Sequence, residues 1–541
     1  MTFLNDDDHS GLYYTGFAKM VKSESIVTET KGSNEKRFLG LGLDLGTTSL
    51  CAAVVDRRQD QLVEVHEQAN DSNIKSPRAY ESLQDADALV SQAISLIDRV
   101  ISRYPDLKVI GVTGQMHGIV YVNAKGEAVS PLATWQDKRG DLNYQDGLSY
   151  CQYLALKTKY PAAAGFGLVT HFYNLVHHQI PEKARTIVTI MDYLTMKLAG
   201  RTTPLSHNSN AASLGCFNLD TGSFDAASLR NVSIDRDWLP AVTDQYELLG
   251  DYRGVPVSVA IGDNQASFLG AVSEPEASIL VNIGTGSQLS VMTNSPVDCG
   301  LEARPYIRNK YLMVGSSLCG GRAYAVMERF FRSIAVSAGA PDKPLYTLMN
   351  QLASQAFAQH HKPGQHDKEK QDNRGNHTDE FEMSDQKKES KQNEMSGLAD
   401  QDSKASQVNE TSQTIPTGHF DPQDQLVMST LFCGTRANPA VRGSIQQISD
   451  QNLTPENVVY GTLCGLAQEL FQFYQDVEPF LEPKPRYVVA SGNAVRKNKV
   501  LRQILGKTFG MTVRLPDYLE EASCGAALFA LTCLEHFSNN T

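Results

Sequence analysis

Short apolar runs alternate with longer stretches of helical periodicity along most of the chain. The apolar runs predict strands at 39–45, 109–112, 255–261, 279–283 and 487–490. Apolar residues at helical spacing predict helices at 85–103, 455–478 and 522–536. Strands interleaved with helices are typical of the α/β class, so we expect an α/β fold.

One short pattern occurs twice along the chain. Residues 41–49 read LGLDLGTTS and residues 279–287 read ILVNIGTGS. Each copy is an apolar run followed by Asp or Asn, an aliphatic residue, Gly-Thr, a small residue and Ser. Strand-like sequences, LCAAVVD and QLSVM, follow the two copies, so each predicts a β-hairpin. The recurrence predicts two related domains that open with the same unit.

Two segments lack the alternation of apolar runs and helical stretches. Residues 1–37 are polar and mixed in charge, and we expect them to form a flexible N-terminal extension. Residues 361–415 are densely charged and hold a single aromatic residue, Phe381. Such a segment cannot bury enough apolar surface to offset its chain entropy, so it predicts a disordered insertion.

Composition narrows the class of protein. The 541 residues are 41% hydrophobic and 20% charged, which excludes a collagen-like, coiled-coil or wholly disordered chain. The net charge of −12 argues against nucleic acid as a partner, because binders of phosphate backbones are basic. No apolar run reaches the roughly 18 residues of a membrane span, so no membrane partner is expected.

The compartment follows from the N-terminus and the cysteines. Asp6, Asp7 and Asp8 lie where a secretory signal would be basic and then apolar. The nine cysteines are scattered without any C-x-x-C spacing, which argues against a disulfide framework and a zinc site. We therefore expect reduced thiols and a cytoplasmic protein.

The repeated Gly-Thr loops are candidates for phosphate binding. Glycine allows close backbone approach, and successive N–H groups form a nest that suits phosphate oxygens. The hydroxyls of Thr47, Thr48, Thr285 and Ser287 add donors, and Asp44 can hold Mg²⁺ directly or through water. An ordinary hairpin turn is the alternative, favoured for one copy and disfavoured for two matched copies. Motifs of P-loop enzymes, protein kinases and Rossmann dinucleotide sites are absent.

Asp263 is the candidate general base. It follows the apolar run at 255–261 and precedes a helical pattern, in the sequence VPVSVAIGDNQASFLGA. Phosphoryl transfer to a hydroxyl needs a carboxylate that orients the nucleophile and accepts its proton. On these residues alone the favoured alternative is an N-cap, the commonest role of Asp before a helix.

Several polar residues at strand ends and in loops have the chemistry to bind sugar hydroxyls or a nucleotide. Gln and His supply directional hydrogen bonds, and an aromatic residue beside Asp and Arg suits a polyol. The candidates for sugar binding are Gln115, Met116 and His117 in VTGQMHG, Trp135, Asp137 and Arg139 in TWQDKRG, and the polar run 208–213. A structural histidine and a surface turn with a half-buried Trp are the alternatives. The small-residue turn at 491–493, before a helix, suits a nucleotide.

Together these motifs resemble those of the FGGY carbohydrate kinases, which have the actin/Hsp70-like (ribonuclease H-like) ATPase fold. The resemblance covers nearly all of residues 38–541 apart from the insertion at 361–415. It implies two α/β ATPase-type domains with an interdomain cleft. Residues 38–262 would form the N-terminal sugar-binding domain and residues 263–541 the C-terminal nucleotide-binding domain.

The resemblance also implies roles for individual residues. LGLDLGTTS and VNIGTGS are similar to the family's two phosphate loops, and Asp263 falls on its catalytic base. The implied nucleotide- and phosphate-binding residues are Asp44, Gly46, Thr47, Thr48, Gly284, Thr285, Gly286, Gly320, Gly321, Gly492, Asn493 and Asn498. The implied sugar-binding residues are Gln115, Met116, His117, Trp135, Asp137, Arg139 and Asn210. Asp44 would also help to place Mg²⁺.

Within the family, TWQDKRG, SNAASLGCFN and GDNQASF are most similar to the sedoheptulokinases. This implies ATP-dependent phosphorylation of the primary hydroxyl of sedoheptulose to give sedoheptulose 7-phosphate, with Mg²⁺ as cofactor. A sugar and ATP are then the expected small-molecule partners. Two alternatives stay open, a pentulose kinase of the xylulokinase or ribulokinase type and a non-catalytic nucleotide-dependent sensor on the same fold.

Overall fold

The computed structural model describes residues 37–361, 425–435, 438 and 440–540. The expected N-terminal extension and the expected insertion therefore lie outside the described residues, apart from Arg37 and His361. In the described part, no helix is both long and apolar enough to cross a membrane.

The N-terminal half is built on a sheet of six strands in the order β14-β15-β6-β1-β2-β3. Its strands are β1 Leu39–Leu45, β2 Ser49–Asp56, β3 Gln61–Ala69, β6 Val109–Gly114, β14 Leu248–Tyr252 and β15 Val255–Ser258. β1 and β2 form an antiparallel hairpin, and β1 runs parallel to β6. The hairpin expected at the first Gly-Thr loop is confirmed.

The C-terminal half contains a second sheet of six strands, in the order β18-β19-β17-β16-β22-β23. Its strands are β16 Ser278–Ile283, β17 Ser287–Thr293, β18 Glu302–Pro305, β19 Tyr311–Ser317, β22 Tyr487–Ser491 and β23 Thr512–Arg514. β16 and β17 form an antiparallel hairpin, and β16 runs parallel to β22. The second expected hairpin is confirmed as well.

The two sheets share one topology. The order β3-β2-β1-β6-β15 corresponds to β19-β17-β16-β22-β23, and the neighbouring strands have the same relative directions in both. Asp44 and Asn282 occupy equivalent positions, paired with Thr113 and Ser491. The expectation of two related domains, drawn from the repeated loop, is confirmed.

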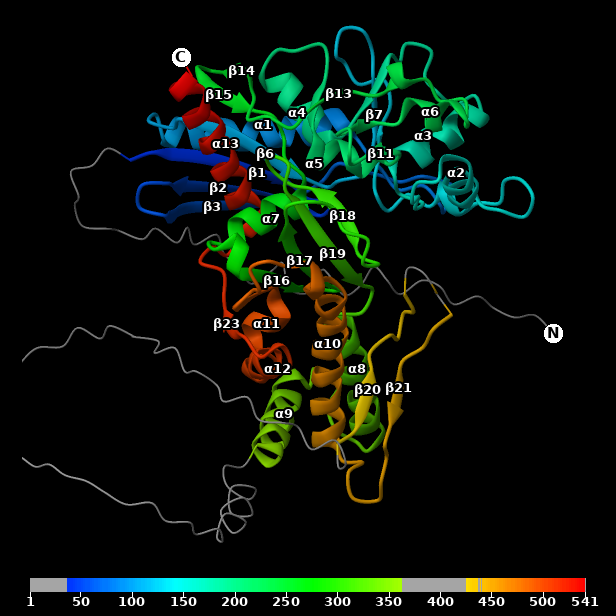
Figure 1. Cartoon of the computed structure of the whole chain (residues 1–541), viewed down its shortest axis with the longest axis vertical. Coiled ribbons are helices and arrows are strands. Elements are labelled where there is room, and N and C mark those ends of the chain that lie inside the picture. Colours follow the sequence, from blue (N-terminus) through cyan, green and yellow to red (C-terminus); the bar gives the residue numbers. More distant parts are fainter. Residues whose placement is uncertain (1–36, 362–424, 436–437, 439, 541) are drawn as a thin grey trace, which may run out of the picture.

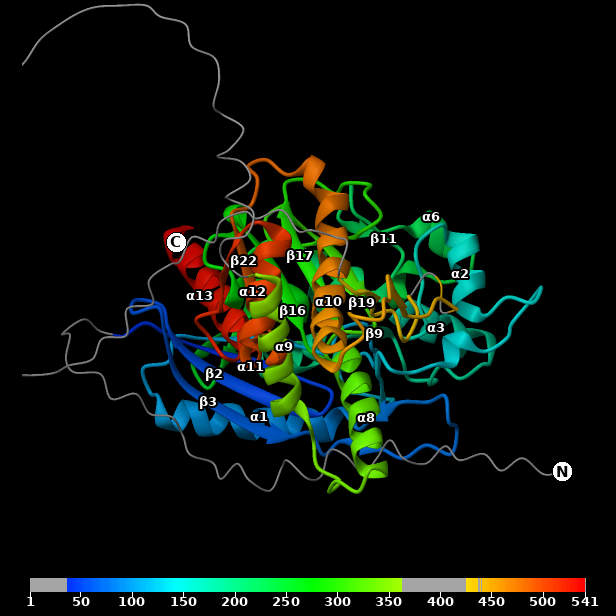
Figure 2. The ribbon, with the colours of Figure 1, turned by 90° about the horizontal axis from the view of Figure 1, so that it is seen from below.

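Helices cover both sheets. They are α1 Ala86–Arg103, α2 Tyr150–Thr158, α3 Gly167–Val176, α4 Ile190–Leu198, α5 Asn208–Ala211, α6 Ala226–Arg230, α7 Asp263–Ala271, α8 Gly321–Ser337, α9 Tyr346–His360, α10 Pro455–Val477, α11 Asn493–Lys497, α12 Lys499–Phe509 and α13 Glu521–Asn540. Figure 1 shows the first sheet in the upper part of the molecule and α8, α9, α10 and α12 in the lower part. Figures 1 and 2 both place α9, α10 and α12 side by side.

Short strands complete the described structure. The three-stranded sheet contains β4 Asn73–Ile74, β5 Leu83–Gln84 and β8 Leu132–Ala133. The two-stranded pairs are β7 Val120–Val122 with β9 Thr186–Val188, β10 Leu205–His207 with β13 Ala241–Thr243, β11 Phe217–Asn218 with β12 Ser223–Phe224, and β20 Val427–Ser429 with β21 Ser444–Gln446.

Helix α1 shows how local sequence sets these elements. The side chain of Asp85 accepts a hydrogen bond of 2.9 Å from Ala88 N and so caps the helix. Its apolar residues recur at helical spacing and are buried against the sheet. The expected helix at 85–103 is therefore found, with Asp85 as its cap rather than its first residue.

The last helix, α13, packs on the first sheet. A Cβ atom on Gly42 of β1 would lie 1.8 Å from Ser523 O, and one on Gly111 of β6 would lie 2.1 Å from Ala526 O. Glycines at these positions let the helix backbone touch the strands. Part of the segment 263–541 thus lies against the sheet of the segment 38–262, and the domain boundary itself stays a prediction.

Helices α7 and α13 cross equally closely. A Cβ atom on Gly270 would lie 2.0 Å from Glu521 O, and one on Gly525 would lie 1.8 Å from Ala266 O. The small residues at the start of the last helix therefore serve close packing. Since α7 begins with Asp263, this contact also fixes the candidate base relative to the first sheet.

Candidate active site

The first Gly-Thr loop joins β1 to β2, and its carbonyl groups accept hydrogen bonds from Asn70 and Gln84. Asn70 Nδ2 donates to Gly46 O at 3.1 Å and to Thr47 O at 3.2 Å. Gln84 Nε2 also donates to Thr47 O, at 2.9 Å, and Asn70 N donates to Thr48 O at 2.9 Å. The loop is thus held in place through its acceptors.

The second loop, between β16 and β17, is held in the same way by the start of α8. Gly321 N donates to Gly284 O at 2.7 Å, and Gly320 N donates to Thr285 O at 3.0 Å. A Cβ atom on Gly320 would lie only 2.1 Å from Gly286 O. The pair Gly320-Gly321 therefore allows close contact between the helix start and this loop.

The two loops leave the same groups available. Among the described residues, no hydrogen-bond acceptor pairs with the N–H groups of Thr47, Thr48 or Thr285. Backbone N–H groups at the tip of a turn are the donors that bind phosphate oxygens. The arrangement is what a phosphate-binding nest requires, and it occurs once in each half of the chain.

Two carboxylates lie near the first loop. Burial raises the pKa of Asp44 to about 7, and the charges of Asp263 and Glu520 add to this rise. Burial also raises the pKa of Asp263, against the opposing effect of Arg304. Because the charge of Asp263 adds to the raised pKa of Asp44, Asp44 from β1 and Asp263 from α7 lie near each other.

Asp263 is the first residue of α7 and not its cap. The N-cap position belongs to Gly262, which has extended backbone angles, and no side chain caps this helix. The interpretation of Asp263 as an N-cap, favoured on its residues alone, is therefore wrong. The strand expected at 255–261 is also shorter, since β15 ends at Ser258. The carboxylate of Asp263 is left for another role.

Gln115, Met116 and His117 follow the carboxyl end of β6. Gln115 Nε2 donates to Gln84 Oε1 at 2.8 Å, and Gln84 in turn holds the first loop. Gln115 Oε1 is buried and has no protein partner. A Cβ atom on Gly262 would lie 3.0 Å from Met116 Cε, so Met116 lies beside the candidate base.

His117 has a positive φ of 72° and a fixed ring. Its Nδ1 lies 2.7 Å from Ser213 O, and its imidazole stacks on Phe166 with 4.6 Å between ring centroids. Ser213 belongs to the polar run 208–213. The structure therefore brings together two of the segments that sequence patterns assign to the sugar.

Trp135 reaches the first loop. Its indole Nε1 donates to Thr47 Oγ1 at 2.9 Å, while 47% of the residue is exposed. A half-exposed ring bonded to a hydroxyl of the first Gly-Thr loop is suited to covering a bound polyol.

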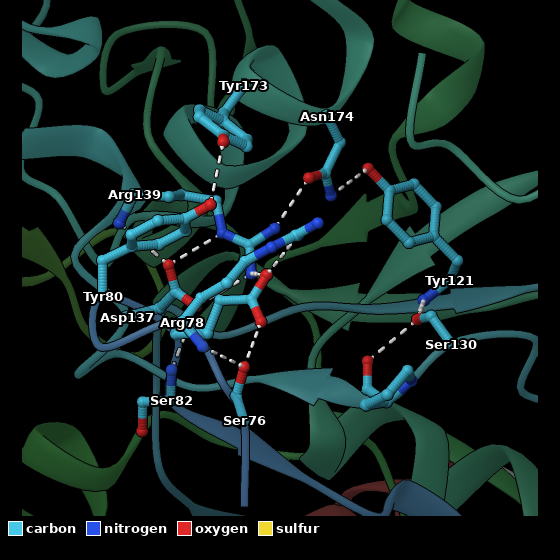
Figure 3. Close-up of polar contacts among 12 residues, drawn as sticks. Ser76, Arg78, Tyr80, Ser82, Tyr121, Ser130, Asp137, Arg139, Tyr173 and Asn174 are labelled. Carbon is cyan, nitrogen blue, oxygen red and sulfur yellow. Dashed lines mark hydrogen bonds and ion pairs between the residues drawn. The ribbon is translucent and has the colours of Figure 1, made fainter. Parts of the chain in front are cut away.

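Asp137 and Arg139 follow Trp135 in the sequence and are bonded to each other. Arg139 Nε donates to Asp137 Oδ1 at 2.7 Å, and Arg139 Nη2 donates to Asp137 Oδ2 at 2.8 Å. Figure 3 shows this forked pair with Asn174, which accepts from Arg139 Nη1 at 2.7 Å. Both residues of the pair are buried. The interpretation of this segment as a surface turn is therefore wrong for them, and their contact with sugar stays a prediction.

The sequence matches the profiles of both domains of one family. The N-terminal domain of the FGGY family of carbohydrate kinases matches residues 39–270, and its C-terminal domain matches residues 279–533. The chain belongs to the FGGY family of carbohydrate kinases. It is accordingly a sugar kinase, an enzyme that transfers a phosphoryl group from ATP, and the resemblance drawn from its motifs is confirmed.

The individual proteins that are similar to this chain include other sugar kinases. Human sedoheptulokinase is 28% identical over 548 residues, covering 92% of this kinase and 98% of the human protein. A xylulose kinase of Streptomyces coelicolor is 29% identical over 276 residues, or 48% of this chain and 56% of that protein. A solved gluconate kinase from Lactobacillus acidophilus superposes with a TM-score of 0.69 at 15% identity, covering 93% and 90% of the two chains. That likeness shows the two-domain actin-like fold.

The expected nucleotide segment of this FGGY kinase follows β22. Gly492 has φ 92°, and a Cβ atom there would lie 2.5 Å from Ile283 O. Asn493 begins α11, whereas Asn498 caps α12 by accepting from Leu501 N at 3.0 Å. Asn498 is thus already engaged in a helix cap, and its contact with the nucleotide stays a prediction.

Glu521 links that segment to α13. Its Oε1 accepts hydrogen bonds from Ser491 Oγ at 2.8 Å and from Arg496 Nη2 at 2.7 Å. Because α13 lies on the first sheet, this carboxylate joins the expected nucleotide segment of the C-terminal half to the strands of the N-terminal half. Neither Glu521 nor the loop-holding residues Asn70 and Gln84 carries a motif that would have indicated its role from sequence.

Asn210 is fully buried in this kinase. Its Nδ2 donates to Thr189 Oγ1 at 2.7 Å and to Asp192 Oδ2 at 2.9 Å, and Oδ1 has no protein partner. Next to it, Ser209 Oγ accepts from Gly262 N at 3.1 Å. The segment around Asn210 therefore supports the backbone just before Asp263, and a sugar contact through Oδ1 stays a prediction.

The raised pKa of Asp192 predicts that the stability of the protein depends on pH. Burial raises its pKa from 3.8 to about 6, so the folded state binds this proton more tightly than the unfolded chain. The stabilisation that proton binding by Asp192 gives the folded state is fully present below pH 3.8, and it is lost as pH rises through about 6. Relative to wild type, Asp192→Asn should therefore gain thermal stability between about pH 4 and 6 and show no further change above this range.

Differential scanning calorimetry across this pH range tests that expectation. Asp251→Asn, at an exposed aspartate on β14, serves as the matched control and should give a melting temperature that runs parallel to wild type. Parallel curves for Asp192→Asn as well would contradict the raised pKa.

Proposed function

We propose that this kinase phosphorylates the primary hydroxyl of sedoheptulose with ATP, giving sedoheptulose 7-phosphate. The observation that carries the proposal is the extent of the match to human sedoheptulokinase, which covers 92% of this chain and 98% of that protein. The match to the Streptomyces coelicolor xylulose kinase covers only 48% and 56%. The free thiols of all nine cysteines accord with the cytoplasmic location that we also propose.

In this proposal Asp263 orients the sugar hydroxyl and accepts its proton as the phosphoryl group is transferred. Its raised pKa suits a general base, since it brings proton affinity closer to the working pH. Met116 lies beside it, and Gln115 offers an unpaired Oε1 to a hydroxyl. Trp135 would cover the sugar from the side of the first loop.

The loops at 46–48 and 284–286 would bind the triphosphate of ATP through their available N–H groups. Each loop is already held by its carbonyl groups, so little reorganisation is needed when a phosphate binds. Closure of the two halves would then exclude water and limit ATP hydrolysis.

The donor set near Asp44 fits Mg²⁺. Burial and the two neighbouring carboxylates raise its pKa to about 7, and a divalent cation would relieve that repulsion. Within the described residues, no three His, Cys, Asp or Glu side chains gather closely enough to hold a metal by themselves. This accords with Mg²⁺, which is commonly held by one or two carboxylates, water and phosphate oxygens. When bound, the ion would neutralise charge on the phosphates.

Release of ADP measured with a panel of sugars tests the proposal. The value of kcat/KM is expected to be at least about tenfold higher with sedoheptulose than with xylulose, ribulose or glycerol, since a site that pairs each substrate hydroxyl rejects analogues that lack one. A higher kcat/KM with xylulose or ribulose would contradict the proposal and indicate that the substrate is a pentulose. Slow ADP release independent of any sugar would indicate a nucleotide-dependent sensor.

A further inference from the structure

Cys319 and Cys433 are distant in sequence but adjacent in the C-terminal half. Cys319 is fully buried and directly precedes Gly320-Gly321, which hold the second loop. Cys433 is half-buried in a turn that follows β20. Cys319 forms a small buried cluster with Ala323 and Leu466, and Cys433 packs against this cluster.

The surroundings distinguish the two thiols. Arg322 Nη1 donates to Cys433 Sγ at 3.6 Å, and Arg442 adds a second positive charge nearby. Burial alone would raise the pKa of Cys433, but Arg322, Cys319 and Arg442 together lower it. Burial raises the pKa of Cys319 to about 11. Cys433 is thus the more accessible and more nucleophilic thiol of the pair.

We propose that Cys319 and Cys433 are a reversible thiol–disulfide site whose closure alters the second Gly-Thr loop. The site combines a partly exposed cysteine beside two arginines with a buried cysteine in the cluster against which it packs. This combination is typical of redox-sensitive pairs, in which one thiol is attacked first and the other resolves the product.

The oxidant is a low-molecular-weight disulfide such as oxidised glutathione. The Cys433 thiolate attacks one sulfur of this disulfide, forming a mixed disulfide and releasing one glutathione thiolate. Cys319 then loses its proton and attacks Cys433 Sγ, which releases the second glutathione. Two protein thiols are oxidised, one glutathione disulfide is reduced to two thiols, and the bond formed joins Cys319 to Cys433.

Closure of the bond acts on the nucleotide side through the backbone. The two sulfurs must approach to about 2.05 Å, closer than a hydrogen-bonded pair of thiols. Cys319 is followed immediately by the N–H groups that bind Gly284 O and Thr285 O. A shift at Cys319 therefore displaces the second loop, and ATP affinity is expected to fall at least about threefold in the oxidised protein, since binding needs donors held in place.

Peptide mapping of the full-length protein tests the bond. After incubation with oxidised glutathione, digestion without reductant is expected to yield a Cys319–Cys433 cross-linked peptide that disappears with dithiothreitol. Cys433→Ser should abolish the cross-link, and Cys151→Ser, at another partly exposed thiol, should leave it intact. Absence of this peptide from wild type, or accumulation of a stable glutathione adduct on Cys433 alone, would overturn the proposal.

Two further measurements test separately the reactivity of Cys433 and the effect of the disulfide on ATP affinity. Alkylation of Cys433 by iodoacetamide at pH 7 should slow several-fold in Arg322→Gln, and an unchanged rate would refute the role of the arginine. Titration of ATP into reduced and oxidised protein should show the loss of affinity. That readout rests on the phosphate-binding role proposed above, whereas peptide mapping does not, so an intact cross-link with unchanged affinity would refute only the coupling to the loop.

Discussion

Replacing Asp263 with Asn is expected to lower kcat at least about a thousandfold while the affinity for ATP stays within about threefold of wild type. The amide has nearly the same shape but cannot accept the proton of the sugar hydroxyl. Asp263 begins α7 without capping it, so the substitution breaks no cap. It also removes one of the charges that raise the pKa of Asp44. Steady-state kinetics and calorimetric titration of ATP measure the two effects.

The pH profile identifies the role of the lost group. In wild type the acidic limb of kcat/KM should lie above the ordinary range of an aspartate, because burial raises the pKa of Asp263. That limb should disappear in Asp263→Asn. Asp251→Asn, a substitution of an exposed aspartate, is the matched control and should behave as wild type. Near-normal turnover of Asp263→Asn would remove the carboxylate from the mechanism.

Strands buried in the middle of each sheet could be predicted because their sequences are continuous apolar runs. β1 has the bounds expected at 39–45, and β16 and β22 differ from expectation by a residue. The repeat of the Gly-Thr loop was informative for a different reason. A turn that recurs in two halves of one chain reflects a repeated topology, and both sheets have that topology.

The predictions failed where a side chain can serve two purposes. Asp before a helix usually caps it, yet Gly262 takes that position and releases Asp263. Asp and Arg two residues apart left a surface turn open as the alternative, yet Asp137 and Arg139 bind each other in the interior. Which use is made depends on backbone direction and burial, and a single sequence does not contain this information.

Contacts between distant segments were beyond sequence patterns. Asn70 and Gln84 hold the first loop from polar stretches without periodicity. The packing of α13 on β1 depends on Gly42, which in sequence looks like any glycine in a strand. The contacts of Asn70 and Gln84 span 24 and 37 positions and the contact of Gly42 with Ser523 spans hundreds, and local propensity carries no signal for either kind.

Arg139→Met is expected to be the most destabilising single substitution at the site. It leaves the Asp137 carboxylate buried without its cationic partner, and the donors that remain among the contacts found are two backbone N–H groups, of residue 139 at 3.0 Å and of Ser82 at 3.2 Å. Breaking a buried pair by removing one partner costs about 3–5 kcal/mol, because the remaining charge is uncompensated. Trp135 lies two residues before Asp137, so the loss should also disturb its contact with Thr47.

A double variant separates the charge from the packing. In Asp137→Asn/Arg139→Met no buried charge is left, so much of the lost stability should return. Arg253→Met is the control, because it breaks an exposed Arg–Asp pair of 2.8 Å with Asp98 and should change stability by less than about 1 kcal/mol. Urea unfolding followed by tryptophan fluorescence measures the midpoints, since Trp135 and Trp238 both lie in the N-terminal half. Equal midpoints for the single and double variants would show that the forked pair stabilises this half by packing rather than by charge.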